Sequence, residues 1–391
     1  MVTLDAEMKT LVDTRKVANV SYGLWQNGDL KAEGYYGSVS SENCETVSDT
    51  TIYRIYSMTK PITAIGMLIL MERGAFELDD PITKILPEFA ETEVLADYDE
   101  DGNLYTYRPP APPTMRQLLS HTAGFAYGNQ ANSVIDRRLI EMEIMRSRTS
   151  SDLISKVASL PYARAPGAEW QYSIASDLQG AIIERVAGES LDAFLTREIF
   201  DPLGMRDTGF YVAHDQLDRI SGVTEYAPGN LTYIDYEAAD FASQAQYFFE
   251  GGKGLYSTQA DYSRFLTFLI KDGQVGGRQL LQPETLKKFR TNKIQYRGKA
   301  STVSRSGQSA GLGFGFGVGT IENSAVSKLA APKSSYYWRG ALGTWFWVDP
   351  ENDLFFIGMV QSRSGFEDDL LQESMRIIYG PPAVSDAHDP A

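Results

Sequence analysis

A serine and a lysine, Ser57 and Lys60, lie three positions apart in the stretch Thr51-Ile-Tyr-Arg-Ile-Tyr-Ser-Met-Thr-Lys-Pro-Ile-Thr-Ala64. The apolar residues that follow predict a buried helix that runs to about Arg73. Side chains three apart on a helix share one face, with Cβ atoms roughly 5–6 Å apart, so the amine of Lys60 would reach the Ser57 hydroxyl. The start of a helix also directs free backbone N–H groups at an anion that forms there. A chain of this length should contain about one such pair by chance, so other motifs must decide its meaning.

Both ends of the chain have the sequence pattern of antiparallel strands. Near the N-terminus, Asn27-Gly28 is a strong signal for a tight hairpin turn between two strands. Near the C-terminus, bulky residues alternate with glycine from Gly311 to Gly319. The predicted strands are Ala18–Gln26, Leu30–Gly37, Gly311–Gly319, Tyr336–Val348 and Leu354–Gln361, and Glu367–Tyr379 is predicted to be a closing helix.

The middle of the chain has helical patterns instead, after an acidic, proline-rich loop at Glu91–Pro113. The predicted helices are Met115–Ser120, Val134–Arg146, Asp152–Ser159, Ser176–Ala187 and Leu191–Ile199. We therefore expect an α/β (α+β) fold, in which an antiparallel sheet flanked by helices carries an inserted all-helical domain. The expected domains are 1–80 together with 250–391, which hold the sheet, and 81–249, which is the insertion. Clefts favour such domain borders.

The composition excludes several classes of function. The chain has 391 residues with 36 Lys and Arg against 51 Asp and Glu, so its formal charge of −15 disfavours binding to nucleic acid or anionic lipid. A lone cysteine, Cys44, cannot form an internal disulfide, and no Cys/His cluster has the spacing of zinc ligands. No secretory signal is recognisable, and the longest apolar run, Ala64–Met71, is too short to span a bilayer. We expect a cytoplasmic protein without metal, organic cofactor or membrane partner.

Four further stretches accompany Ser57 and Lys60. They are Leu118-Leu-Ser-His-Thr-Ala-Gly-Phe125, Gln171-Tyr-Ser-Ile174, Gly251-Gly-Lys-Gly-Leu-Tyr-Ser-Thr258 and Trp338-Arg-Gly-Ala341. The set and its order resemble the serine β-lactamase-like superfamily, and within it the family VIII carboxylesterases, which are related to class C β-lactamases and D-alanyl-D-alanine carboxypeptidases. The resemblance covers nearly the whole chain, from about Ala18 to Gln361. It implies a helical domain inserted in an α/β sandwich, with the active site between them.

The resemblance also implies roles for individual residues. Ser57 matches the nucleophile, Lys60 its lysine partner, and Tyr172 in the stretch Gln171–Ile174 matches the general base. The segment Trp338–Gly340 occupies the place of the Lys-Thr-Gly strand of β-lactamases. The backbone N–H groups of Ser57 and Ala341 would then form the oxyanion hole.

This chemistry works without a histidine. A free tyrosine has a pKa near 10, so a phenolate base at neutral pH needs roughly 4 kcal/mol of stabilisation. One cation at about 4 Å supplies roughly 4 kcal/mol at an effective dielectric constant near 20. The charge of Lys60 is therefore about sufficient to stabilise the phenolate. Which of the two groups carries the proton at rest is a property of the coupled pair of Lys60 and Tyr172.

Two departures from the β-lactamase pattern point to a neutral substrate. Trp338 stands where a β-lactamase has the lysine that holds a β-lactam carboxylate, and Ile174 stands where it has an asparagine. Arg339 could restore a positive charge, but on a strand it should point away from the face of Trp338. Among the remaining motif residues, His121 is predicted to be structural, Tyr127 and Asn129 are candidates for facing the substrate, and Gly251–Gly254 predicts a tight turn near the cleft.

A rival nucleophile is Ser309, because Gly307-Gln-Ser-Ala-Gly311 matches the Gly-x-Ser-x-Gly elbow of α/β-hydrolases, and Asp349 and His388 would follow in the expected order. The context opposes it, since an elbow needs an apolar strand before the serine and a helix after it. We therefore predict a serine carboxylesterase for small, short-acyl esters, with a small-molecule substrate and an oligomeric state that the sequence leaves open. The alternatives are a β-lactamase or peptidase, an acyltransferase, and a non-catalytic ligand-binding relative.

Overall fold

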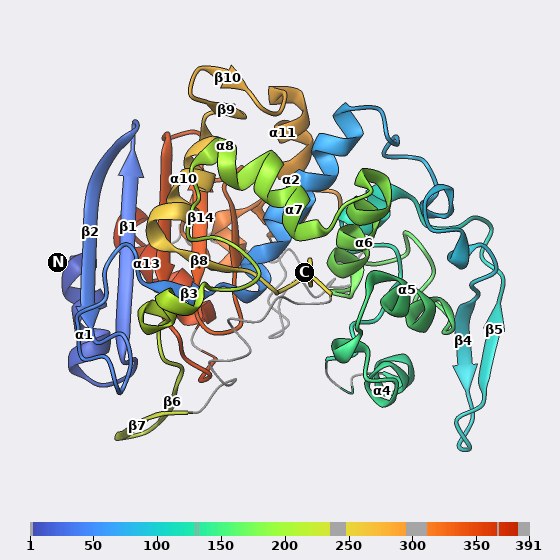
Figure 1. Ribbon diagram of the computed structural model, residues 1–391, viewed down its shortest axis with the longest axis horizontal. Helices are drawn as coiled ribbons and strands as arrows, with labels where there is room; N and C mark the ends of the chain where they lie inside the picture. The colour runs from blue at the N-terminus through green and yellow to red at the C-terminus, as the bar shows by residue number, and fades with distance from the viewer. Residues whose placement is uncertain are drawn as a thin grey trace, which may run out of the picture.

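One seven-stranded antiparallel sheet joins both ends of the chain, as the sequence predicts (Figure 1). The computed structural model describes residues 3–129, 131, 133–234, 248–294, 311–365 and 367–381. The N-terminal strand β1 pairs with the C-terminal strand β15, and Ser21 lies opposite Met359. The strand order is β11 (Leu312–Phe314), β12 (Gly319–Ile321), β13 (Tyr336–Arg339), β14 (Trp345–Asp349), β15 (Leu354–Met359), β1 (Asn19–Gln26) and β2 (Asp29–Gly37).

The hairpin between β1 and β2 turns at Asn27-Gly28, where both residues have positive φ angles, 57° and 79°. This is the turn that the dipeptide predicts. Two other stretches predicted as single strands are also hairpins. The stretch Gly311–Gly319 divides into β11 and β12, and Tyr336–Val348 divides into β13 and β14. Glycines at positive φ, Gly317 at 81° and Gly343 at 94°, make these tight turns possible.

The two faces of the sheet carry different helices. Along β14, Trp345 and Trp347 pack in one hydrophobic cluster with α1 (Leu4–Asp13) and α13 (Glu367–Tyr379), whereas Phe346 and Val348 pack in the other, with α2 (Thr59–Glu72) and α10 (Gln259–Ile270). This alternation follows from the period of two along a strand. Residues Thr59 to Leu70 of α2 are all buried, which confirms the prediction for the apolar helix. None of the helices in the described residues combines the length and apolar character that spanning a bilayer requires.

The inserted middle part is mainly helical, and its helices are α3 (Met115–Leu119), α4 (Val134–Glu141), α5 (Ser150–Ala158), α6 (Ala175–Ala187), α7 (Leu191–Leu195) and α8 (Asp201–Leu203). It is not all-helical, however. The expected loop Glu91–Pro113 contains the hairpin β4 (Val94–Tyr98) and β5 (Leu104–Tyr107), and a second hairpin consists of β6 (Thr224–Ala227) and β7 (Asn230–Tyr233). Both hairpins are short and largely exposed, so they lack the buried apolar alternation by which a strand is recognised.

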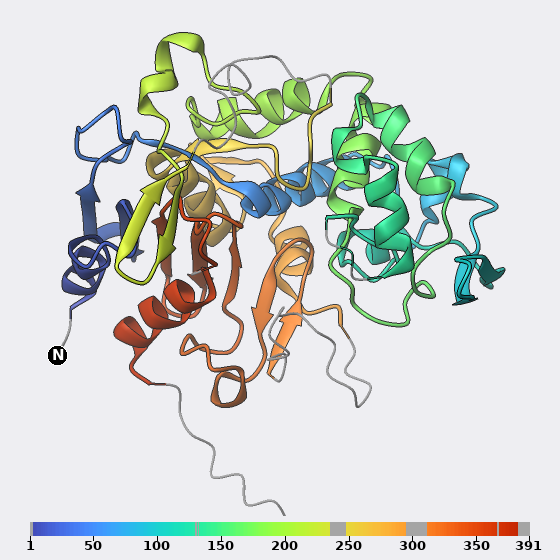
Figure 2. The same cartoon turned by 90° about the horizontal axis from the view of Figure 1, so that it is seen from below.

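Helix α2 joins the two parts. It packs against α6 and α7 of the helical part, and Figure 2 shows it between that part and the sheet. Gly66 allows close packing here, because a Cβ at that position would lie only 3.1 Å from Ile183 and 3.2 Å from Leu195. A small second sheet, β3 (Ile52–Arg54) with β8 (Tyr256–Thr258), ties the start of α2 to the segment that leads into α10. The remaining helices are α11 (Pro283–Arg290) and α12 (Ser324–Ser327), beside a two-residue hairpin of β9 (Gln274–Val275) and β10 (Arg278–Gln279).

Candidate active site

Ser57 lies in a short 3₁₀ turn, η1 (Tyr56–Met58), between strand β3 and helix α2. Tyr56 has a positive φ of 44°, which is uncommon for a residue other than glycine and is found at strained functional turns. The turn is fixed from several sides. Tyr262 donates a hydrogen bond to the carbonyl of Met58 at 2.9 Å, and the N–H of Ile55 donates to the carbonyl of Leu255 at 3.1 Å. Ser57 itself is only partly buried, so its hydroxyl is held firmly and can be reached.

Two proton-carrying groups converge on the Ser57 hydroxyl. The phenolic oxygen of Tyr172 lies 2.8 Å from Ser57 Oγ, and Lys60 Nζ lies 3.2 Å from it. Lys60 Nζ also lies 4.6 Å from the centroid of the Tyr172 ring. The structure therefore brings together the three side chains that the motifs single out, although Tyr172 is 115 residues away from Ser57 in the sequence.

The amine of Lys60 is completely buried, and its hydrogen bonds are fully used. Besides Ser57 Oγ, it donates to the carbonyl of Gly252 at 2.6 Å and to the Tyr127 hydroxyl at 3.3 Å. An ammonium group has three N–H donors, so each has an acceptor. Tyr127 is itself held in place, because Asp136 of α4 accepts a hydrogen bond from its backbone N–H at 3.0 Å.

Asp177 places a buried carboxyl group close to Lys60, and nothing in the sequence singled it out. Its carboxylate, on α6, accepts a hydrogen bond from the N–H of Gly252 at 3.0 Å. The same peptide segment thus links Asp177 to Lys60. Burial raises the pKa of the Asp177 carboxyl, and the positive charge of Lys60 opposes that shift. Residue 252 has to be small, because a Cβ there would lie 2.6 Å from the Asp177 carboxylate.

The stretch Trp338–Ala341 reaches the site at the end of β13. A Cβ on Gly340 would lie 2.4 Å from the carbonyl oxygen of Ile55, so only glycine lets this strand approach η1 so closely. Trp338 points to the same side as Tyr172, with ring centroids 5.7 Å apart. Its buried Nε1 has no hydrogen-bond partner in the described part of the chain. Ala341, whose N–H is predicted to serve the oxyanion hole, follows in the exposed turn after Gly340.

The other sequence candidates have different surroundings. Arg339 points to the opposite face of β13, as strand alternation predicts, and forms an ion pair with Asp368 at 2.7 Å. Ile174 is buried and precedes α6, so its side chain belongs to the core. Asp349, the acid proposed to work with Ser309, is buried and accepts a hydrogen bond from Tyr379 at 2.9 Å. Ser309 and His388 lie outside the described residues.

Comparison with known proteins places this arrangement in a family. The sequence model of the Beta-lactamase family matches residues 4–378 of this chain. The chain belongs to the β-lactamase family. Esterase EstB of Burkholderia gladioli is 28% identical over 362 residues, which cover 88% of this chain and 86% of EstB. Acyltransferase calJ of Penicillium decumbens is 27% identical over 324 residues, which cover 78% of this chain and 74% of calJ.

A solved structure agrees with the sequence relatives. Unliganded simvastatin synthase LovD from Aspergillus terreus, as the selenomethionyl derivative, has a TM-score of 0.81 and 25% identity, and the match covers 95% of this chain and 96% of that one. The β-lactamase-like fold expected from the motifs is thereby confirmed. This β-lactamase-family chain is a serine hydrolase by family, and its relatives include both esterases and acyltransferases.

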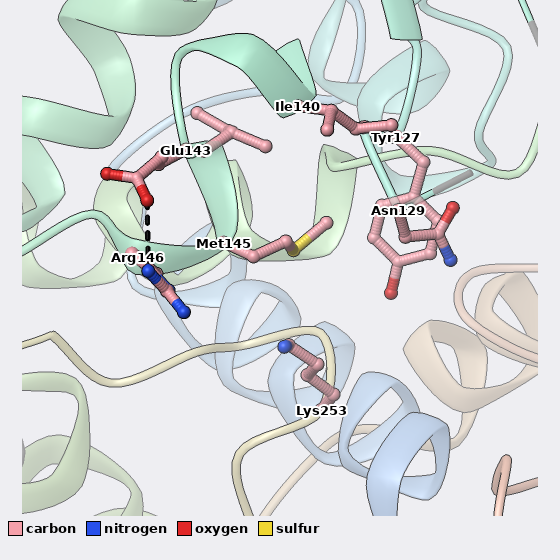
Figure 3. Close-up of a pocket in the computed structure, with 9 residues that line it drawn as sticks. Tyr127, Asn129, Ile140, Glu143, Met145, Arg146 and Lys253 are labelled. Atoms are coloured by element: carbon pink, nitrogen blue, oxygen red, sulfur yellow. Dashed lines mark hydrogen bonds and ion pairs between the residues drawn. The ribbon is translucent and has the colours of Figure 1, made fainter. Parts of the chain in front are cut away.

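The β-lactamase-family chain has a cavity of about 360 Å³, and Figure 3 shows the side chains that line it. Tyr127 connects this cavity with Lys60, because its hydroxyl contacts the Lys60 amine and its side chain lines the cavity. Lys253, next to Gly252 in the sequence, also lines the cavity. The lining residues are Tyr127, Gly128, Asn129, Ile140, Glu143, Ile144, Met145, Arg146 and Lys253.

A break in a predicted helix shapes this cavity. The helix predicted to run from Val134 to Arg146 ends at Glu141, and Glu143 has a positive φ of 51°. The chain turns there, so that Met145 comes to line the cavity. Asn129 lines it too, as does Tyr127, whereas no lining residue comes from 91–113. The stretch Glu91–Pro113 therefore takes no part in this cavity.

His121 is buried beside Tyr172, with ring centroids 5.1 Å apart. Burial, and secondarily the positive charge of Lys60, lower the pKa of its imidazole from 6.5 to about 3. A histidine that is neutral when folded but titrates normally when unfolded stabilises the fold above pH 6.5, and this stability is lost as the pH falls toward 3.

We therefore expect His121→Asn to flatten the acid side of the stability curve. Between pH 7 and pH 5 the wild-type histidine should cost about 2 kcal/mol of unfolding free energy, because the unfolded state binds a proton that the folded state does not. Urea unfolding at the two pH values measures this change for both proteins. An equal loss of stability in the wild type and the variant would contradict the expectation.

Proposed function

We propose that this protein is a serine carboxylesterase that hydrolyses small, short-acyl esters through an acyl-enzyme on Ser57. One observation carries the proposal: Tyr172 Oη and Lys60 Nζ both lie within hydrogen-bond distance of Ser57 Oγ, at 2.8 and 3.2 Å. A nucleophile within reach of a base, with a third group to hold that base, is the arrangement that covalent catalysis requires.

In the first half of the reaction, Ser57 Oγ attacks the ester carbonyl and its proton passes to the phenolate oxygen of Tyr172. The charge of Lys60 stabilises the phenolate before the transfer. Negative charge develops on the carbonyl oxygen of the substrate, and the N–H groups of Ser57 and Ala341 are the proposed donors to it. Tyr172 then gives the proton to the departing alcohol. The acyl group stays bound to Ser57 Oγ through an ester bond.

The second half repeats these steps with water. Tyr172 removes a proton from the water that attacks the acyl carbonyl, and returns a proton to Ser57 Oγ as the carboxylic acid leaves. No further proton donor is required, because each proton taken up by Tyr172 is released in the same half-reaction.

The surroundings of Ser57 favour a neutral ester over an anionic β-lactam. Trp338 places an indole where a β-lactamase has its lysine, and Arg339 is engaged by Asp368 on the other face of the strand. Lys60 already has three acceptors. We therefore expect p-nitrophenyl acetate to be hydrolysed with a higher kcat/KM than a chromogenic cephalosporin.

Labelling with a serine-reactive phosphonate tests the proposal directly. One equivalent should attach to the protein, and peptide mapping by mass spectrometry should find it on Ser57. A label on Ser309, or no label on a folded protein, would contradict the assignment. A cephalosporin turned over faster than any ester would instead favour the β-lactamase or peptidase alternative.

Acyl transfer to an alcohol is the second candidate. The cavity beside Tyr127 has a volume of about 360 Å³, which suits a larger alcohol than the simplest esters contain, and calJ is named as an acyltransferase. In this reaction an alcohol replaces water in the second half. Adding alcohols of increasing size to a p-nitrophenyl acetate assay, with the ester product measured against acetate, separates transfer from hydrolysis.

We further expect that the cavity accepts the alcohol portion of the substrate. Met145→Trp should fill part of it and lower kcat/KM for 1-naphthyl acetate by about tenfold, because the bulky alcohol loses its space. The effect on methyl acetate should stay within about threefold. Steady-state kinetics with both acetates measures the difference, and a p-nitrophenyl octanoate control shows whether the acyl chain uses the cavity instead.

A further inference from the structure

His121 holds the backbone on both sides of Tyr172. The N–H of Gln171, the residue before the tyrosine, donates to the carbonyl oxygen of His121 at 2.9 Å. The N–H of Ser173, the residue after it, donates to Nδ1 of the His121 ring at 3.2 Å. One residue therefore binds the backbone N–H groups of both neighbours of Tyr172, Gln171 and Ser173.

The conformation of His121 makes this double contact possible. Its φ angle is 55°, in the left-handed region that few residues other than glycine adopt and in which histidine, asparagine and aspartate are enriched. The imidazole packs edge-on against the rings of Trp170 and Phe314, with centroid distances of 6.3 and 5.5 Å. Nδ1 accepts from the N–H of Ser173 and also lies 3.0 Å from Ser173 Oγ. This pattern assigns the ring proton to Nε2, which lies 3.5 Å from Ser176 Oγ.

Tyr172 needs such support because it belongs to no helix or strand. It lies in the irregular segment that precedes α6, so no regular ladder of backbone hydrogen bonds holds it. Its phenolic oxygen nevertheless has to stay at hydrogen-bond distance from Ser57. A misplacement of about 1 Å at a catalytic group can cost about a hundredfold in rate.

We propose that His121 is a positioning residue for Tyr172, and that its Nδ1 and carbonyl oxygen fix the backbone from which the phenol reaches Ser57. The inference rests on the proposed role of Tyr172. His121 itself exchanges no proton with the substrate: its ring centroid is 5.1 Å from that of Tyr172, and none of its hydrogen bonds goes to Ser57.

Two variants separate the acceptor from the backbone conformation. Asparagine and glycine both tolerate a positive φ, but only asparagine has an oxygen close to the position of Nδ1. His121→Gly should lower kcat for p-nitrophenyl acetate by about 10- to 100-fold with KM changed less than about threefold. His121→Asn should keep kcat within about threefold of the wild type. Thermal unfolding confirms that both variants are folded at the assay temperature.

Small molecules provide an independent test if the asparagine variant does not fold. Imidazole should enter the space left by His121→Gly and restore at least a tenth of the wild-type rate, whereas pyrrole, which lacks the acceptor nitrogen, should not. The double variant with Ser57→Ala gives the background from imidazole alone. Equal rates for the Gly and Asn variants, or equal rescue by imidazole and pyrrole, would overturn the proposal.

The rate of phosphonate labelling at Ser57 distinguishes this result from a failure of the esterase proposal. If the wild type is labelled but hydrolyses no ester, the esterase assignment fails while the effect of His121 can still be measured as a labelling rate. If His121→Gly is labelled as fast as the wild type, the positioning role fails while the esterase assignment stands.

Discussion

Ser57→Ala should abolish the esterase activity, lowering kcat for p-nitrophenyl acetate by at least about 10³-fold. The substitution removes only the oxygen to which Tyr172 and Lys60 are hydrogen-bonded. The nearby hydroxyl groups at the start of α2 have other partners: that of Thr59 accepts from the N–H of Leu255, and that of Thr63 donates to the carbonyl of Gly251. Loss of a serine nucleophile in other hydrolases costs up to about 10⁶-fold. The rate that remains should come only from the uncatalysed reaction and from the contribution of substrate binding.

Ser309→Ala is the matched control, because it tests the rival Gly-x-Ser-x-Gly motif with the same chemical change. We expect its kcat to stay within about threefold of the wild type. Circular dichroism and thermal unfolding show whether each variant is folded. Activity that survives Ser57→Ala but disappears with Ser309→Ala would reverse the assignment of the nucleophile.

Tyr172→Phe should lower kcat by about 10³-fold while KM changes little. The ring contacts of Tyr172 with His121 and Trp338 do not involve the phenolic oxygen, so the variant should keep its packing and lose only the proposed base. General bases contribute typically 10²- to 10⁴-fold. Pre-steady-state measurement of p-nitrophenol release should show that acylation itself is slowed.

Tyr127→Phe provides a control for the loss of a phenol near Lys60. The Tyr127 hydroxyl lies 3.3 Å from Lys60 Nζ, but its hydrogen bond is to the amine and not to Ser57. We expect at most about a tenfold loss of kcat. Equal losses in the Tyr127 and Tyr172 variants would mean that the two phenols act only by stabilising Lys60, and the reaction would then need another base.

Local interactions explain why much of the fold was predictable. The φ angles at Asn27-Gly28 are those of the expected turn, and the burial of α2 follows from its uninterrupted apolar sequence. The approach of Ser57 to Lys60 depends on a spacing of three residues, which the geometry of one turn determines. The order of the motifs was sufficient to indicate the family, because it survives changes elsewhere in the chain.

Other features depended on contacts that no local pattern records. Alternation continues across the tight turns at Gly317 and Gly343, so two hairpins had the pattern of two single strands. The link from Lys60 through Gly252 to Asp177 joins three distant segments, and an aspartate in the first turn of a helix is usually explained by the helix itself.

The sequence by itself determined the residue types at the site, the pairing of Ser57 with Lys60 on one turn, and the sheet shared by the two ends of the chain. Only the tertiary structure decided the distance of 2.8 Å between Tyr172 and Ser57, the ion pair of Arg339 with Asp368, and the support that His121 offers. The physical reason is the sequence separation of the groups. Backbone geometry fixes the relative positions of residues a few positions apart, whereas only the packing of the whole core fixes those of groups more than a hundred positions apart.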